Sequence, residues 1–559
     1  MTSPWTSRTL RRISTRVLGA AWVIAASAHA QPHPHPHPID AAPLIAAPPI
    51  VQTSQGAVSG KMISGTRAYL GLPYAAPPVG ELRWQSPQPP VRWQGTRNGA
   101  EFGQRCAQPL SALSPASVNE DCLFLNVYAP DGIGRGKLPV MVWIHGGAFL
   151  SGSAAEYDMS KLAQKAQAVV VSINYRLGAF GFLRQPELAA QNTASNLGLQ
   201  DQQAALRWVG SQIGKFGGDA SRVTIFGHSA GSASVCLHMV SPQSKGLFHR
   251  AIMQSGACHL LTATPPATMQ AQTVALGVRL GCPEGRGQLA CMRQKPAADV
   301  MRLSVPNGNE VNGVDIRWTP VQDGVTLKGD PDRLVQQGRF HRVPVIVGST
   351  HDEGRLFVAS EYHLANLAPV NEADVNDHIG RIAPRDSALA ARMRSTYTAQ
   401  AYGTLDLAFS ALLTDHYFSC DAVRDAEAFS RHVPTYNYEF TEPSASNPDP
   451  LMPLGAFHGL ELIYLFQSNQ VMPESMDALS GAQLKLSEQM IKYWGRFAAM
   501  GQPNSFLPPY SACKRENSHK SGRAVTVWRT PFNCSSADWV EFKSVSSVAN
   551  RRKISSVFS

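Results

Sequence analysis

The stretch Val223-Thr224-Ile225-Phe226-Gly227-His228-Ser229-Ala230-Gly231 lies near the middle of this 559-residue chain and indicates how it folds. Val223 to Phe226 is a continuous apolar run, typical of a strand that is buried on both faces. Ala230 to Val235 is a run of small residues that predicts the start of a helix. The G-x-S-x-G pattern between them therefore predicts a sharp strand-to-helix turn, in which glycines let other segments approach the backbone closely.

Other short apolar runs extend the same pattern along the chain. Val140 to Ile144, Val169 to Ile173 and Val345 to Val347 are bounded by turn residues and predict further buried strands. Leu199 to Phe216 carries apolar residues at helical spacing on one face. Strands that alternate with helices indicate a mostly parallel central sheet with helices on both faces. Because no linker interrupts the middle of the chain, we expect one large α/β domain over residues 49–512.

Charge and composition exclude several classes of protein. The chain is 43% hydrophobic and 16% charged, which excludes a disordered chain. Its formal net charge of +10 comes from the two ends, +4 in residues 1–30 and +6 in residues 513–559. Residues 31–512 hold 37 basic and 37 acidic side chains. The sequence therefore predicts no nucleic-acid groove in the body of the protein.

The first residues have the pattern of an export signal. Four arginines precede an apolar run over 17–26, and Ala28-His29-Ala30 fits a small-x-small cleavage site. The run is too short for a membrane anchor, which needs about twenty residues. We expect residues 1–30 to be removed and the mature protein to be soluble, either secreted or periplasmic. Residues 31–48 are rich in Pro and His; they predict a stiff spacer, with metal capture by three histidines as the alternative.

Ser229 stands where a nucleophilic serine would be expected. A strand-to-helix turn pushes the serine oxygen out of the backbone and places the Ala230 N–H beside it. Gly146 and Gly147 follow the predicted strand that ends at Ile144. Taken alone, this pair would be a tight turn. Beside a nucleophile, the backbone N–H groups of Gly146, Gly147 and Ala230 predict an oxyanion hole.

A serine nucleophile needs a base, and the base needs an orienting carboxylate. Asp352 and Glu353 follow a predicted strand at the end where sites form in parallel sheets. Spacing leaves these two acids as equal candidates, and either alone would more often be a solvated loop carboxylate. His458 lies in a glycine-flanked loop and is the candidate base, although alone it would more often be structural.

The nine cysteines fit an exported protein that forms short-range disulfides. Cys236 and Cys258 differ from the other seven because they lie in apolar stretches. We expect these two to be free and buried.

Several ordered segments now identify a family that the chain resembles. They are Tyr69-Leu70-Gly71-Leu72-Pro73-Tyr74-Ala75, Pro77-Pro78-Val79-Gly80-Glu81-Leu82-Arg83-Trp84, Glu120-Asp121-Cys122-Leu123-Phe124-Leu125-Asn126-Val127, Asn174-Tyr175-Arg176-Leu177-Gly178, Phe216-Gly217-Gly218-Asp219, Gln254-Ser255-Gly256 and Gly501-Gln502-Pro503-Asn504. Together with the turn at Ser229, they resemble the type-B carboxylesterase, or cholinesterase-like, family of α/β-hydrolases. The match runs from about residue 50 to 510 and is far more specific than G-x-S-x-G.

The resemblance implies an α/β-hydrolase fold and a serine carboxylic ester hydrolase acting on small to medium esters. It assigns the catalytic carboxylate to Glu353 and the base to His458, with no metal or organic cofactor. The family's disulfide frame implies Cys106 with Cys122 and Cys282 with Cys291. It also implies that Cys420 pairs near the C-terminus, here with Cys534 or Cys513.

Three departures from the family pattern bear on function. His228 stands where the family often has Glu, which changes the charge beside the nucleophile. The basic, Ser-rich residues 513–559 do not follow the family's ending, so an esterase damaged by this tail is a further alternative. The loop between Cys106 and Cys122 holds no aromatic residue, which argues against choline esters. A non-catalytic binding scaffold on the same fold is the alternative function.

Overall fold

Apolar runs of the sequence become the central strands of the computed structural model. Val169–Ile173 forms β8, and the run at 140–144 lies within β7 (Leu138–Ile144). The structure describes residues 48–111, 114–132, 136–190, 195–258, 264–304, 318–364, 368–443, 447, 449–468, 479–504 and 528–530. All of these residues belong to one compact unit, which begins at Pro48.

Ten strands form one mixed sheet. Its order is β13-β12-β11-β10-β9-β7-β8-β6-β4-β3. The six strands from β12 to β8 pair in parallel, and the outer strands pair antiparallel. The bounds are β3 (Lys61–Ile63), β4 (Thr66–Pro73), β6 (Phe124–Pro130), β9 (Gly218–His228), β10 (Arg250–Gln254), β11 (Val345–Thr350), β12 (Thr435–Phe440) and β13 (Trp528–Thr530). A separate small sheet joins β1 (Ile50–Gln52), β2 (Ala57–Ser59) and β5 (Thr96–Asn98).

Both faces of the sheet are buried, because neighbouring residues of one strand enter different hydrophobic cores. In β7, Val140 and Val142 belong to one core, whereas Met141 and Trp143 belong to the other. This explains why the central strands read as continuous apolar runs rather than as an alternating pattern.

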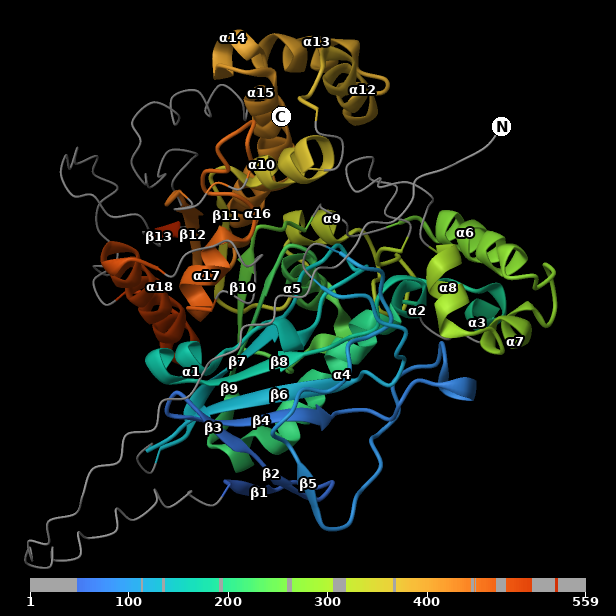
Figure 1. Ribbon diagram of the computed structural model, residues 1–559, viewed down its shortest axis with the longest axis vertical. Coiled ribbons are helices and arrows are strands. Elements are labelled where there is room, and N and C mark those ends of the chain that lie inside the picture. The colour runs from blue at the N-terminus through green and yellow to red at the C-terminus, as the bar shows by residue number, and fades with distance from the viewer. Residues whose placement is uncertain are drawn as a thin grey trace, which may run out of the picture. The chain divides into compact units, whose positions relative to one another are not determined.

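Helices cover each face. The first core takes side chains from α4 (Leu197–Gln212) and α5 (Ala230–Val240). The second takes them from α1 (Ser160–Ala166), α17 (Leu460–Phe466) and α18 (Gly481–Met500). Figure 1 shows the twisted sheet running between these helices. The predicted α/β-hydrolase fold, with a mostly parallel centre and helices on both faces, is confirmed.

A third core lies among helices that follow β11. It involves α10 (Glu353–Val358), α12 (Glu372–Ile382), α13 (Ser387–Thr396) and α15 (Leu405–Thr414). Figure 1 shows α12, α13, α14 (Ala399–Tyr402) and α15 gathered at one end of the molecule. Because α10 begins directly after β11 and packs on α15, this helical group lies at the carboxyl ends of the parallel strands.

The remaining helices complete the connections between strands. They are η1 (Gly80–Leu82), η2 (Ala154–Glu156), α2 (Gly178–Phe182), α3 (Pro186–Ala190), η3 (Ile213–Phe216), η4 (Pro242–Ser244), α6 (Pro266–Arg279), α7 (Gln288–Arg293), α8 (Ala297–Ser304), α9 (Pro331–Gln336), η5 (Ala359–His363), η6 (Asp415–Ser419) and α16 (Cys420–Ser430). In the ranges given above, no helix has both the length and the apolar character needed to cross a membrane.

What the sequence predicts for the two ends of the chain remains largely untested. The export signal and most of the Pro/His-rich spacer lie outside the described residues. Of the basic segment 513–559, only β13 is described, and it pairs antiparallel with β12 at the edge of the sheet.

Candidate active site

The turn after β9 is closed to side chains at both of its glycines. A Cβ atom on Gly227 would lie 2.5 Å from backbone atoms of Gly231. A Cβ atom on Gly231 would lie 2.0 Å from the carbonyl oxygen of Ile144, the last residue of β7. Only glycine therefore fits where β9 and α5 pass the end of β7.

Ser229 occupies this turn in a conformation that non-glycine residues rarely adopt. Its φ is 57° and its ψ is −124°, and it is the residue that precedes α5. The Ser229 N–H donates to the Gln254 carbonyl at 2.9 Å, which ties the turn to the end of β10. Ser229 is partly exposed, whereas its neighbours His228 and Ala230 are buried. The turn therefore presents the serine and hides the residues beside it.

A second pair of glycines follows β7 and meets the serine. A Cβ atom on Gly146 would lie 3.0 Å from the Ser229 Cβ. Gly147 has a φ of 104°, and a Cβ there would lie 2.2 Å from the Ser151 carbonyl oxygen. Ala230 begins α5, where a backbone N–H has no acceptor within the helix. The structure thus places Gly146 and Ala230 beside Ser229, with Gly147 next in the same turn.

Glu353 and His458 meet although they are 105 residues apart. His458 Nδ1 lies 2.5 Å from Glu353 Oε2, and both side chains are buried. The other carboxylate oxygen of Glu353 accepts the Thr350 N–H at 2.8 Å. Gly354 is as constrained as the glycines of the serine turn, because a Cβ there would lie 2.0 Å from the Ser410 carbonyl oxygen. The first turn of α10 is therefore fixed with Glu353 facing His458.

Asp352, the other candidate acid, binds the loop of His458 instead of its ring. Its N–H donates to the Ala456 carbonyl, and its Oδ2 accepts the Ala456 N–H, each at 2.9 Å. Arg355 lies 2.9 Å from Asp352 Oδ1 and also donates to the Pro453 carbonyl at 2.9 Å. Burial alone would raise the pKa of Asp352, but His351 and Arg355 hold that pKa below its ordinary value. Asp352 is thus an ionised anchor for the segment just before His458.

Three rings surround the imidazole of His458. The ring centroids of His228, Phe418 and Phe357 lie 4.3, 4.8 and 5.1 Å from that of His458. Phe418 belongs to η6 and Phe357 to α10, so helices after β11 form the apolar wall of the site. This wall keeps water from the buried pair that His458 makes with Glu353.

A second acid and imidazole, Glu461 and His228, lie next to the pair formed by Glu353 and His458. His228 Nε2 is 3.9 Å from Glu461 Oε1, and Gln254 donates to the same oxygen at 3.3 Å. Burial, and then the neighbouring Glu353 carboxylate, raise the pKa of Glu461 to about 8. Burial, and then the charge of His458, lower the pKa of His228 well below its ordinary value. Both Glu461 and His228 are therefore expected to be neutral at pH 7.

The link between the predicted nucleophile and the predicted base runs through His228. Ser229 and His458 are both described, and no hydrogen bond joins the serine hydroxyl to the imidazole. They are connected through His228, which precedes Ser229 in the chain and packs on His458. Such contacts often tighten only when a substrate is bound.

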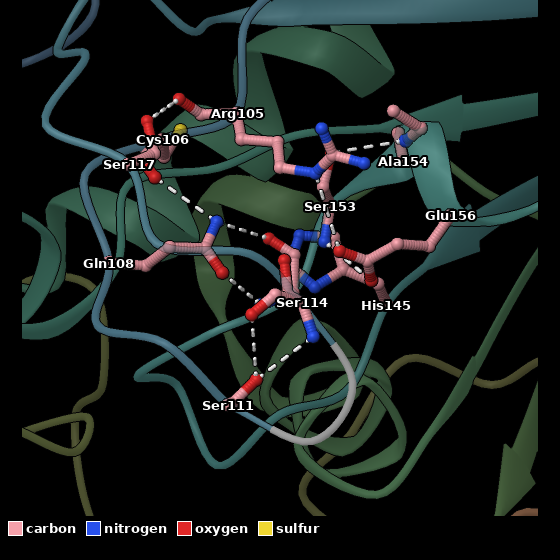
Figure 2. Close-up of polar contacts among 12 residues, drawn as sticks. Arg105, Cys106, Gln108, Ser111, Ser114, Ser117, His145, Ser153, Ala154 and Glu156 are labelled. Carbon is pink, nitrogen blue, oxygen red and sulfur yellow. Dashed lines mark hydrogen bonds and ion pairs between the residues drawn. The ribbon is translucent and has the colours of Figure 1, made fainter. Parts of the chain in front are cut away.

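Gln108 holds the turn after β7 from outside, and local sequence gave no sign of this role. Its side-chain amide donates to the Gly152 carbonyl at 3.1 Å and accepts the Gly152 N–H at 2.8 Å. Figure 2 shows this amide among the polar contacts that join residues 105–117 to the segment from His145 to Glu156. A Cβ on Gly152 would lie 2.5 Å from His145 Nδ1, so the amide clamps the backbone against His145. A lone glutamine 44 residues away carries no motif that would predict this contact.

Three disulfides occur in the described residues. Two are the pairs that the resemblance implied, Cys106–Cys122 and Cys282–Cys291. The third joins Cys236 to Cys258, so the prediction that these two are free was wrong. Both are fully buried, and their Cα atoms lie 5.4 Å apart because the segment after β10 runs beside α5. Their apolar sequence context reflects this burial and does not exclude a bond.

Cys420 begins α16, whereas its predicted partners, Cys513 and Cys534, lie outside the described residues. That pairing stays a prediction.

Known proteins resemble this chain over most of its length. A model of the carboxylesterase family matches residues 47–527. The para-nitrobenzyl esterase of Bacillus subtilis is 35% identical over 467 residues, which are 82% of this chain and 91% of that protein. The acylcarnitine hydrolase of Mus musculus is 35% identical over 493 residues, 83% of this chain and 85% of that protein.

A solved structure agrees with these sequence matches. A PNB esterase superposes with a TM-score of 0.69 at 33% identity, covering 82% of this chain and 91% of that one. The chain belongs to the carboxylesterase family and is a carboxylic ester hydrolase.

Proposed function

We propose that this hydrolase cleaves small to medium carboxylic esters through Ser229, His458 and Glu353, by way of an acyl-enzyme. The observation that carries the proposal is the buried 2.5 Å contact between His458 Nδ1 and Glu353 Oε2. The contact between His458 and Glu353 lies at the same carboxyl ends of the parallel strands as Ser229, because β9, β11 and β12 run in one direction. A buried carboxylate on Nδ1 fixes the tautomer whose Nε2 can accept a proton.

In the proposed reaction, each group has one role. Ser229 attacks the ester carbonyl while His458 takes the serine proton, and Glu353 stabilises the imidazolium that forms. His458 returns the proton to the leaving alcohol, and an acyl group remains on Ser229. Water repeats the sequence with His458 as base and releases the acid.

The negative charge of each tetrahedral intermediate needs donors that are already in place. We propose that the backbone N–H groups of Gly146, Gly147 and Ala230 supply them. A Cβ atom on Gly146 would lie 3.0 Å from the Ser229 Cβ, and Ala230 lies at the positive end of α5. One such donor typically contributes about 3 kcal/mol of transition-state stabilisation.

The surroundings of His458 favour neutral, apolar esters. Phe357 and Phe418 pack on the imidazole, and His228 adds no negative charge beside the serine. A cationic choline group would find neither a carboxylate at position 228 nor an aromatic residue in the loop from Cys106 to Cys122.

The test compares hydrolysis of p-nitrophenyl butyrate by the mature protein and by Ser229→Ala. We expect turnover in the parent and a loss of several orders of magnitude in the variant, with matched circular dichroism. Ser211→Ala is the control, because the Ser211 hydroxyl donates to the Trp208 carbonyl of its own helix. A folded parent no faster than Ser229→Ala would remove Ser229 as the nucleophile for that ester, and would favour a binding scaffold or a pocket closed to simple esters.

We also propose that the chain is exported and cleaved after Ala30. Three disulfides support an oxidising compartment for the mature protein. Expression of the full chain with N-terminal sequencing of the exported product tests this. A first residue of Gln31 is expected, and retention of the uncleaved chain inside the cell would contradict it.

A further inference from the structure

Three consecutive carbonyl groups in the turn after β7 each accept at least one hydrogen bond. The Tyr175 hydroxyl donates to the His145 carbonyl at 2.9 Å. His145 Nδ1 lies 2.9 Å from the Gly146 carbonyl oxygen. The Gly147 carbonyl accepts the N–H groups of Leu150 and Ser151 at 2.9 and 3.0 Å.

These bonds also fix three N–H groups. In a trans peptide the N–H points opposite to the C=O of the same unit, and the described residues contain no cis peptide. The carbonyl of His145 therefore orients the N–H of Gly146, that of Gly146 orients the N–H of Gly147, and that of Gly147 orients the N–H of Ala148. Each N–H is aimed by whatever holds the preceding carbonyl.

Tyr175 is placed to hold the first of these carbonyls rigidly. It follows β8, whose last residue, Ile173, pairs with Ile144 at the end of β7. The Tyr175 ring stacks on the His145 ring, with centroids 4.4 Å apart and planes 19° from parallel. Both side chains are fully buried. The stack fixes the phenol, and the phenol then fixes the peptide unit between His145 and Gly146.

His145 continues the chain of contacts to the next peptide unit. Its Nδ1 faces a carbonyl oxygen, so that nitrogen must carry a proton for the contact to be favourable. Burial lowers the pKa of His145 to about 4, so the ring is neutral at pH 7. Gly152, held by Gln108, packs against the same ring edge.

We propose that Tyr175 is a positioning residue for the oxyanion hole, acting on the Gly146 N–H through the His145 carbonyl and on the Gly147 N–H through the His145 ring. This inference rests on the proposed function, in which those two N–H groups bind the intermediate. Tyr175 does not touch the substrate. Its effect is confined to states that carry charge on the oxyanion, because the neutral ester carbonyl needs these donors less.

Tyr175→Phe tests the proposal because it keeps the ring stack and removes only the hydroxyl. We expect kcat for p-nitrophenyl butyrate to fall about tenfold, less than the 10²–10³ that follows outright removal of a donor. KM should change less than about twofold. Affinity for a trifluoromethyl ketone, whose adduct with Ser229 carries the oxyanion, should fall by the same factor as kcat.

Tyr128→Phe is the matched control. Tyr128 is a fully buried phenol that donates to the Tyr157 carbonyl at 3.3 Å, beyond the turn that holds the glycines. An equal fall of kcat in Tyr128→Phe would overturn the proposal, and so would parent-like ketone binding by Tyr175→Phe. A rise of KM at unchanged kcat would also overturn it.

His145→Phe keeps a ring against Tyr175 and removes the second contact. It decides the question if Tyr175→Phe does not fold, with the same linked fall of kcat and ketone affinity expected and parent-like values overturning the proposal. The failure of the proposed function is recognised separately. If Ser229→Ala retained the parent's turnover, the triad itself would be wrong, whatever Tyr175→Phe does.

Discussion

The imidazole rings of His228 and His458 lie against each other, with centroids 4.3 Å apart. The residue before the proposed nucleophile thus contacts the proposed base. Any charge at position 228 acts on His458 through a buried medium, where it is weakly screened.

His228→Glu should therefore raise the pH at which activity is lost on acidification. A carboxylate beside His458 stabilises the imidazolium, and we expect the acidic limb of kcat/KM to move up by about one pH unit. A pH profile with a neutral p-nitrophenyl ester measures this shift. His228→Gln, which adds no charge, is the control. If the acidic limbs of the pH profiles of His228→Glu and His228→Gln coincided, a charge at position 228 would have no effect on the base.

Glu353→Gln and Asp352→Asn should lower kcat to different extents, because the two adjacent acids have different partners. Glu353 binds the His458 ring, so its amide variant favours the wrong tautomer and should lower kcat by about 10⁴. Asp352 binds the Ala456 backbone, and Asn keeps an acceptor there. We expect less than about a hundredfold loss of kcat. Measured kcat values in the opposite order would assign the orienting acid to Asp352.

Loss of the disulfide that was not expected from sequence should destabilise the protein. Replacing both Cys236 and Cys258 by Ala frees a loop with a sequence separation of 22, which should lower the free energy of unfolding by about 3 kcal/mol. Urea denaturation measures this change. The Cys282–Cys291 pair spans only 9 residues, so its removal is the comparison and should cost less. A larger loss from the shorter loop would contradict the expectation from loop length.

His238 should make the fold sensitive to acid. Burial, and then the charges of His341 and Arg207, lower the pKa of His238 to about 3. The unfolded chain protonates His238 below about 6.5, whereas the folded protein does not. Stability is therefore lost as pH falls from about 6.5 toward 3, by about 1.4 kcal/mol per pH unit.

His238→Gln should remove this contribution. Urea denaturation at pH 6.5, 5.5 and 4.5 should give a shallower loss of stability in the variant than in the parent. Parallel curves would show that His238 takes up no more protons in the unfolded chain than in the folded protein.

Local patterns predicted parts of the strands β7, β8, β9 and β11 and of the helices α4 and α5, because the periodicity of a strand or a helix depends on neighbouring residues. Val169 to Ile173 became β8 with the predicted bounds, and the apolar run before Gly227 became the end of β9. The α/β class followed from their alternation, and the α/β-hydrolase fold was implied by the family resemblance. Burial of both sheet faces by α4, α5 and α18 is the physical reason.

Contacts between distant segments were not predictable from the residues themselves. Asp352 and Glu353 are adjacent, and only the path of the loop before His458 decides which one meets the ring. Gln108 and Tyr175 act on backbone groups, which leave no side-chain pattern at the other end. Cys236 and Cys258 lie in apolar stretches because they are buried in the core, and that context does not reveal that they also form a disulfide.

The proposed catalytic residues are spread over the chain from Gly146 to His458. Each of them follows a different parallel strand of the central sheet. A ribosome adds about 5–20 residues per second, so the serine turn emerges well before the loop that carries its base. A partly synthesised chain holds Ser229 without a proton acceptor. Ester cleavage should therefore begin only after β12 has joined β11 and brought His458 to Glu353. We therefore expect no ester hydrolysis by a chain that is still being synthesised.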